Sequence, residues 1–165
     1  MEKGLALEAL GYFEEALACY ERGLEINPRG SDLWDMKGVA LQALGRTQEA
    51  LACYERGLEI APRDSGLWKN KGVALGKLDR YYEALACFDR GLEIDPRDSR
   101  LWLAKGEALG ALGRRQEALS CFERGLEIAP RNSDLWKYKG SALKALGKTQ
   151  EAEACLRRAG ELGGG

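Results

Sequence analysis

The chain has 165 residues, of which 31% are charged and 45% hydrophobic, a balance typical of a folded protein and not of a disordered one. Its 25 basic and 26 acidic residues leave almost no net charge, so no overall field favours nucleic acid or an anionic membrane surface. No apolar run approaches the roughly 20 residues that span a bilayer, and residues 1–13 lack a basic segment followed by a long apolar core. We therefore expect a cytoplasmic protein that binds neither nucleic acid nor membrane.

A regular interval divides the chain into units. The five cysteines are 34 residues apart, and residues 31–64 agree with residues 99–132 at 25 of 34 positions, so the units share one structure. We expect one tandem array over residues 1–165 in place of the usual globular domain. Its predicted parts are an N-terminally truncated repeat at 1–30, full repeats at 31–64, 65–98 and 99–132, a closing repeat at 133–162, and a tail at 163–165 that is a frayed end or a cloning remnant.

The unit 31–64 begins with a predicted helix. Leu33, Trp34 and Leu41 recur with helical spacing. Ser31 is expected to be the N-cap, and Gly45 stands where a residue in the left-handed conformation commonly ends a helix.

A second helix is predicted to follow at once. Ala50, Tyr54 and Leu58 form one apolar stripe until Pro62 prevents its continuation. Because the connection is short, the two helices should form an antiparallel hairpin, in which the small residues Gly38 and Ala50 let the backbones approach closely.

These residues carry a family resemblance, since the spacing of Trp34, Gly38, Leu41, Ala50, Tyr54 and Pro62 resembles the tetratricopeptide repeat (TPR), a helix-turn-helix unit of 34 residues. The resemblance implies an all-α fold, a right-handed α-α superhelix of about five helical hairpins. Gly57 departs from the alanine usual in the family, and we expect closer packing between units to compensate for its helix-weakening effect. Asp79 replaces the turn glycine of the third unit.

The two ends of the array differ from its middle. Glu153 and Gly160 replace leucines of the earlier units, so the last helix is expected to face water as the end of the array. Met1 enters partway through a first helix, and this unit has no counterpart of Trp34, so the N-terminal edge is expected to expose apolar surface.

The repeated cysteine is expected to pack and not to react. Neighbouring copies would lie about 10 Å apart, beyond the roughly 7 Å between Cα atoms that a disulfide requires. With no histidine and no C-x-x-C pair in the chain, we predict no metal site, no cofactor and no catalytic residue. A half-buried apolar role is the favoured interpretation.

Variation between the units is confined to one face of the first helix. In TPR proteins the first helices line a concave groove that holds an extended peptide or a helix of another protein. We therefore predict a protein-binding groove. Its residues are Asp35, Val39, Lys69, Asn70, Val73, Arg100, Leu103, Glu107, Lys137, Tyr138, Ser141 and Lys144. Acidic residues lie toward the start of this face and basic residues toward its end, which favours a ligand of the reverse polarity.

Other interpretations stay open at this point. The variation can reflect chance differences after recent copying, and the chain can be a self-assembling solenoid that stacks through its N-terminal edge into a homo-oligomer, or an engineered array without a dedicated ligand. The carboxylate clamp by which some TPR proteins bind chaperone tails is predicted absent. Of its five places, which fall on Asp35, Val39, Asn70, Arg100 and Ala104, only Asn70 and Arg100 agree with the clamp.

One lysine recurs at the same place in every unit and could indicate a phosphate-binding surface. This lysine column consists of Lys3, Lys37, Lys71, Lys105 and Lys139. Lys37 lies on the same side of the first helix as Trp34, and glutamates are abundant nearby. A structural role along the packed surface is therefore the favoured interpretation.

Overall fold

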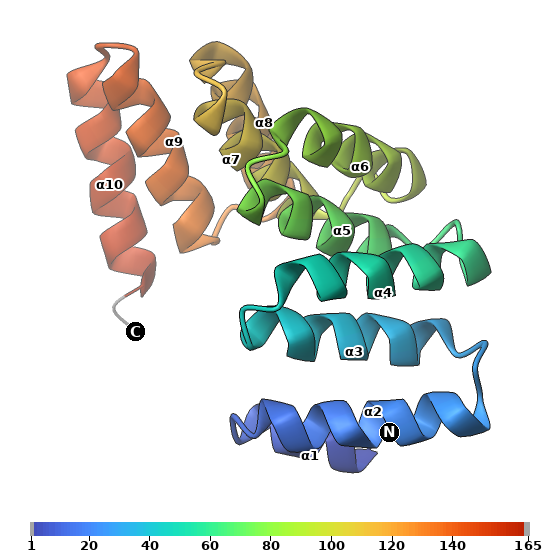
Figure 1. Ribbon diagram of the computed structural model, residues 1–165. Coiled ribbons are helices and arrows are strands. Elements are labelled where there is room, and N and C mark those ends of the chain that lie inside the picture. The colour runs from blue at the N-terminus through green and yellow to red at the C-terminus, as the bar shows by residue number, and fades with distance from the viewer. Residues whose placement is uncertain (1, 164–165) are drawn as a thin grey trace. The chain divides into compact units, whose positions relative to one another are not determined.

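The computed structural model describes residues 2–163, and all of the regular structure in this range is helical. The sequence order is α1 (Glu2–Ala9), α2 (Phe13–Ile26), α3 (Ser31–Ala43), α4 (Thr47–Ile60), α5 (Ser65–Lys77), α6 (Tyr81–Ile94), α7 (Ser99–Ala111), α8 (Arg115–Ile128), α9 (Ser133–Ala145) and α10 (Thr149–Gly163). The predicted all-α class is confirmed (Figure 1). Helix α10 includes Gly163, the first residue of the predicted tail, whereas residues 164–165 and Met1 lie outside the described range.

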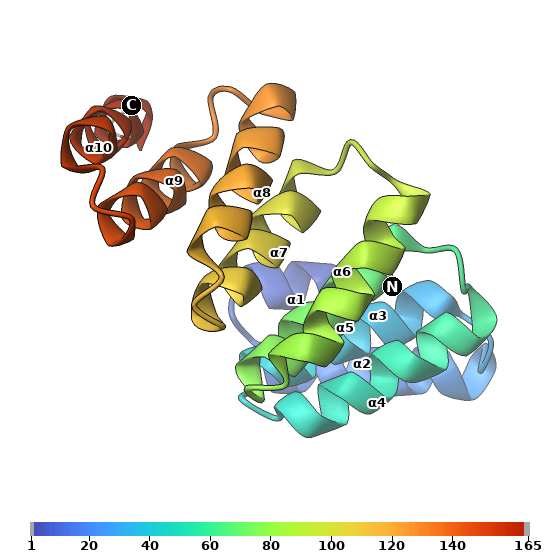
Figure 2. The ribbon, with the colours of Figure 1, turned by 90° about the horizontal axis from the view of Figure 1, so that it is seen from above.

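The chain forms two compact units that divide after Arg80. The first unit contains α1 to α5 and the second contains α6 to α10. In the first, α3 contacts α2, α4 and α5; in the second, α7 contacts α6, α8 and α9 (Figures 1 and 2). A single array over residues 1–165 with five sequence repeats stays a prediction.

The core of the first unit is built from the repeated apolar positions. Leu17 from α2, Leu41 from α3, Tyr54 from α4 and Leu67 from α5 belong to one buried cluster, so consecutive hairpins share their apolar side chains. In the second unit Leu119 of α8 packs with residues of α9 and α10, as expected for a leucine that faces the following hairpin.

Close packing explains the glycine that departs from the family pattern. A Cβ at Gly57 would lie 2.8 Å from Leu67 Cδ2, and a Cβ at Gly125 would lie 2.7 Å from Leu135 Cδ2. The expected compensation is confirmed, because the absent methyl group lets a leucine of the next hairpin sit directly against the helix backbone.

The helix starts correct one prediction. Ser31 is the first residue of α3 and not its N-cap, which is Gly30 and has no side chain to donate or accept. In the later first helices the residue at this same place does cap: Asp64 accepts from the amide of Leu67 at 3.0 Å, and Asn132 accepts from Leu135 at 3.0 Å. A carboxylate or amide at this position reaches the free amides of the first turn, so the serine that follows it is not needed.

The turns between paired helices follow the sequence prediction. Gly45 has a φ of 77°, and Asp79 takes the same left-handed conformation with a φ of 58°. Aspartate tolerates this region better than most residues, which is why the exchange leaves the turn intact.

Each later first helix is also fastened to the loop before it. The indole N–H groups of Trp34, Trp68, Trp102 and Trp136 donate to the carbonyl oxygens of prolines six residues earlier, at 2.9 to 3.0 Å. The tryptophan and proline of the repeat pattern therefore form one contact.

The end of the described chain meets water. Glu153 and Gly160 of α10 are both exposed, as predicted for a closing helix. Near the other end Leu5 of α1 is 43% exposed and Leu10, which follows α1, is 71% exposed, so apolar side chains meet water there as expected.

Candidate functional site

Five of the predicted groove residues lie in the first unit. Asp35 and Val39 are on α3, and Lys69, Asn70 and Val73 are on α5. The Asn70 Nδ2 group donates to Asp35 Oδ1 at 2.8 Å, so this contact joins two successive first helices. Burial raises the pKa of Asp35, and the hydrogen bond from Asn70 opposes the rise. Asn70 is thus engaged by a carboxylate, which disfavours a ligand carboxylate at this place.

The space beside this pair is filled by a tyrosine. Tyr54 on α4 is fully buried, and its hydroxyl donates to Gln42 Oε1 on α3 at 2.9 Å. Its ring lies against Gly38, where a Cβ would be 2.8 Å from Tyr54 Cζ. The glycine of the repeat pattern therefore makes room for a tyrosine ring, and not for close approach of the helix backbones as predicted.

The second unit holds the other seven predicted residues. Arg100, Leu103 and Glu107 are on α7, and Lys137, Tyr138, Ser141 and Lys144 are on α9. Tyr138 stacks on Phe122 of α8 with ring centroids 5.8 Å apart. A hydrogen bond to Glu107, followed by burial, raises the pKa of Tyr138 to about 12. Tyr138 and Glu107 thus connect two successive first helices, as Asn70 and Asp35 do in the first unit.

A pocket of about 380 Å³ opens where α7, α8 and α9 meet. Three predicted residues line it: Glu107, Tyr138 and Ser141. The other lining residues were not predicted from the sequence; they are Gly106, Gly110, Arg115, Ala118, Phe122, Ala142 and Ala145. The lining is mainly apolar, with charged groups from Glu107 and Arg115.

A paired exchange between two positions explains why this pocket is open. Gln42 and Tyr54 stand 12 residues apart and bond to each other, whereas the corresponding residues of the fourth repeat are Gly110 and Phe122. A Cβ at Gly110 would meet no atom within 4 Å, so the space taken by the Gln42 side chain in one hairpin is empty in the other. The exchange is visible in the sequence, because the repeat with Gln42 has Tyr54 and the repeat with Gly110 has Phe122.

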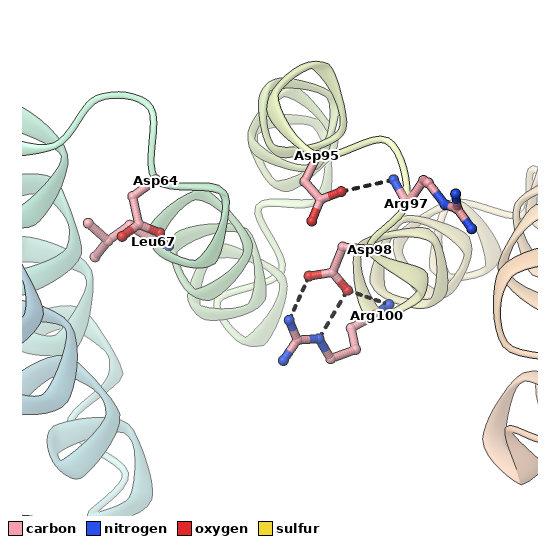
Figure 3. Close-up of polar contacts among 6 residues, drawn as sticks. All are labelled: Asp64, Leu67, Asp95, Arg97, Asp98 and Arg100. Carbon is pink, nitrogen blue, oxygen red and sulfur yellow. Dashed lines mark hydrogen bonds and ion pairs between the residues drawn. The ribbon is translucent and has the colours of Figure 1, made fainter.

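Arg100 takes no part in the pocket. Its Nε and Nη2 atoms donate to the two carboxylate oxygens of Asp98 at 3.0 and 2.8 Å, so the guanidinium folds back on the start of its own helix (Figure 3). Asp98 also accepts from the Arg100 amide as the N-cap of α7. The charge of Arg100 is therefore balanced within the protein, although the side chain stays exposed.

The lysine column has the structural role that was favoured. Lys37 pairs with Glu21 at 3.0 Å, Lys71 with Glu55 at 3.1 Å, and Lys139 with Glu123 at 3.0 Å. Each of these ammonium groups also lies 5.7 to 5.8 Å from the centre of the tryptophan ring in its own helix. A lysine engaged twice in this way contributes little to a phosphate-binding surface.

The cysteines are buried more deeply than predicted. All five are cysteine thiols, and four are buried, with Cys19 the more accessible one. Burial raises the pKa of Cys53, Cys121 and Cys155, which disfavours the reactive thiolate. Within residues 2–163 no group of three His, Cys, Asp or Glu side chains is placed to hold a metal ion. In the same range no helix is both long and apolar enough to cross a membrane.

Comparisons with known proteins agree with the repeat pattern. Family models of the tetratricopeptide repeat match residues 1–29, 31–64, 66–98, 99–142 and 139–162. No curated protein sequence is significantly similar to the chain.

Among solved structures, MamA has a TM-score of 0.84 at 18% identity, with 98% of this chain and 95% of that one covered. MamA from Desulfovibrio magneticus RS-1, residues 41 to the end, has a TM-score of 0.85 at 19% identity, with 98% and 91% covered. YrrB, described as a TPR protein with an unusual peptide-binding site, has a TM-score of 0.74 at 24% identity, with 96% and 82% covered. These similarities extend to the fold.

Proposed function

The chain belongs to the tetratricopeptide repeat family, and on that premise we propose that it is a non-enzymatic scaffold that binds a peptide or helix of a partner protein on its first-helix faces. Proteins of this family are protein-interaction modules. The observation that carries the proposal is the pocket on the α7–α9 face, because residues that differ between the repeats, Glu107, Gly110, Tyr138 and Ser141, line it together with repeated glycine and alanine residues.

The chemistry of the two faces supports binding of a polypeptide. In the first unit the face offers Asn70, Lys69 and the 39% exposed Val39, a mixture of hydrogen-bonding, charged and apolar groups. In the second it offers an aromatic ring at Tyr138 over an apolar pocket. Aromatic side chains with nearby polar groups are typical of the residues that dominate binding energy at protein interfaces. The description of YrrB as having a peptide-binding site is in keeping with this proposal.

Self-assembly is the second candidate. The observation that favours it is the apolar surface near the start of the chain, where Leu5 of α1 and Leu10 and Tyr12 between α1 and α2 are exposed. Head-to-tail stacking would also need an apolar surface on α10, and there Glu153 and Gly160 replace the leucines that join the other hairpins. Light scattering over a hundredfold range of concentration separates the two candidates, since a mass that rises with concentration favours assembly.

The proposal is tested by selecting binders from a random peptide library with the full chain. The selected peptides are then titrated against Asn70→Ala, Leu103→Ala and Tyr138→Ala. Arg124→Ala is the control, because Arg124 is an exposed second-helix residue that pairs with Glu127. We expect Tyr138→Ala to weaken binding about tenfold or more, as loss of an aromatic anchor does. If the selected peptides bind all three variants as well as the original protein, the assignment of the first-helix faces is wrong.

A further inference from the structure

We propose that the pocket between α7, α8 and α9 is an anchor site for one bulky apolar side chain in an acidic segment of the partner. The inference rests on the proposed function and specifies its ligand. It starts from the exchange of Gln42 and Tyr54 for Gly110 and Phe122, which opens the pocket in one hairpin and leaves its counterpart filled in another.

The floor and walls of the pocket accept an apolar group. Phe122 is 3% exposed and presents its ring from α8, and Ala118, Ala142 and Ala145 add small apolar surfaces. The volume of about 380 Å³ is within the range of roughly 300 to 1,000 Å³ that ligand pockets occupy. A side chain of the size of leucine, methionine or phenylalanine therefore fits with part of its backbone.

The polar groups at the pocket are largely engaged by the protein itself. The Tyr138 hydroxyl bonds to Glu107, and the Ser141 hydroxyl donates to the carbonyl oxygen of Lys137 at 3.1 Å. A neutral polar side chain that entered would lose its water and find the hydroxyl groups of Tyr138 and Ser141 already bonded, which is unfavourable. An apolar side chain has no such loss.

The charges around the pocket favour acidic neighbours in the ligand. Lys137 and Lys144 lie four residues before and three after Ser141, so all three share the same face of α9. Arg115 lines the pocket itself. Two carboxylates oppose these three cations, since Glu107 lines the pocket and accepts a hydrogen bond from Tyr138, and Asp134 also acts on Tyr138. The cations outnumber these two acids. A segment with Asp or Glu beside its apolar residue complements this surface.

The first test closes the pocket by giving the fourth repeat the residues of the second. In the variant Gly110→Gln with Phe122→Tyr, the new hydroxyl and amide have the same spacing as the pair that bonds at Tyr54 and Gln42. Gly76→Gln is the matched control, since this glycine occupies the same place in α5 and a Cβ there also meets nothing within 4 Å. Circular dichroism and thermal melting are used to check that both variants fold.

We expect peptides selected with the original protein to contain a bulky apolar residue next to Asp or Glu. The closed variant should bind them about tenfold or more weakly, and the control should bind them unchanged. Replacing the apolar residue of the peptide by alanine should weaken binding to the original protein by a similar factor and should not further weaken binding to the closed variant. Equal affinity for the open and closed proteins, or a consensus of basic or polar residues, overturns the inference.

A second measurement separates this inference from the proposed function. N-acetyl-leucine amide and N-acetyl-aspartate amide, each at millimolar concentration, are titrated into isotope-labelled protein. We expect the leucine probe alone to shift the amide signals of Gly110 and Ser141, and the closed variant to show no shift. Absence of shifts overturns the anchor pocket even if peptides bind elsewhere on the first-helix faces. If the leucine probe causes these shifts but no peptide in the library binds, the anchor pocket is supported and the proposed function is overturned.

Discussion

Replacing Gly38 by alanine should destabilise the protein, although alanine is the better helix former. Alanine in place of glycine inside a helix contributes about 1 kcal/mol. At this site, however, the new methyl group would lie 2.8 Å from Tyr54 Cζ and 2.9 Å from Tyr54 Cδ1. The ring has little room to retreat, because it is fully buried and its hydroxyl is bonded to Gln42. Overpacking of this kind costs about 1 to 3 kcal/mol, and moving the ring would also lose a hydrogen bond of about 1 kcal/mol. The net expectation is a loss of about 1 to 3 kcal/mol.

The assay is urea unfolding followed by circular dichroism, with Gly76→Ala as the control. Gly76 is also in a first helix, and a Cβ there meets no atom within 4 Å, so only the favourable helix effect applies. The unfolding midpoint should fall for Gly38→Ala and rise slightly for Gly76→Ala. If both variants raise the midpoint, the contact with the tyrosine ring is not what requires glycine at position 38.

Four further predictions follow from individual contacts. Tyr54→Phe should lower the free energy of unfolding by about 1 kcal/mol through loss of the bond to Gln42, and an unchanged urea midpoint would show that water replaces that partner. In the native protein Cys19 should react with a chromogenic disulfide reagent well before Cys53, Cys87, Cys121 and Cys155, and five equal rates would contradict their burial. Burial raises the pKa of Asp35 above its unfolded value, so the ionised carboxylate lowers the stability of the folded protein at neutral pH. The variant Asp35→Asn should therefore be more stable than the original protein at pH 7. This difference in stability should fade as the pH falls towards the ordinary carboxyl pKa of about 4. A peptide ending in the acidic tail EEVD should not bind tightly, since Asp35 stands at a clamp position and Arg100 is paired with Asp98; a nanomolar dissociation constant in a titration would refute this.

The repeat unit was predictable because its determinants are local and recur. Helical spacing, the left-handed glycine at 45 and the proline at 62 each act within a few residues, and every copy reinforces the pattern. The same copying made the packing role of Gly57 predictable, since a glycine conserved in place inside a helix indicates close contact. The prediction that Ser31 caps α3 was wrong because the N-cap is the residue before the serine. That residue is Gly30 in this unit and Asp or Asn in the later units.

The candidate site was only partly predictable, because it depends on where side chains meet. Variation along the first helix identified Glu107, Tyr138 and Ser141, which the fold brings to one pocket. It could not identify Phe122, which is on the second helix at the position that Tyr54 holds in the predicted apolar stripe. Nor could it show that Arg100 folds back on Asp98. The sequence allows Arg100 to point either to Asp98 or to the predicted groove until the start of the helix is known.

The link from each tryptophan to a proline carbonyl gives the protein a built-in optical label. Four indoles in matching surroundings should emit as nearly one chromophore, and they report on every hairpin except the first, which has no tryptophan. Because Trp34 contacts the loop after α2, only fraying of α1 is nearly silent in tryptophan fluorescence while it is visible as lost ellipticity. The difference between the two melting curves isolates the behaviour of that helix without any added dye.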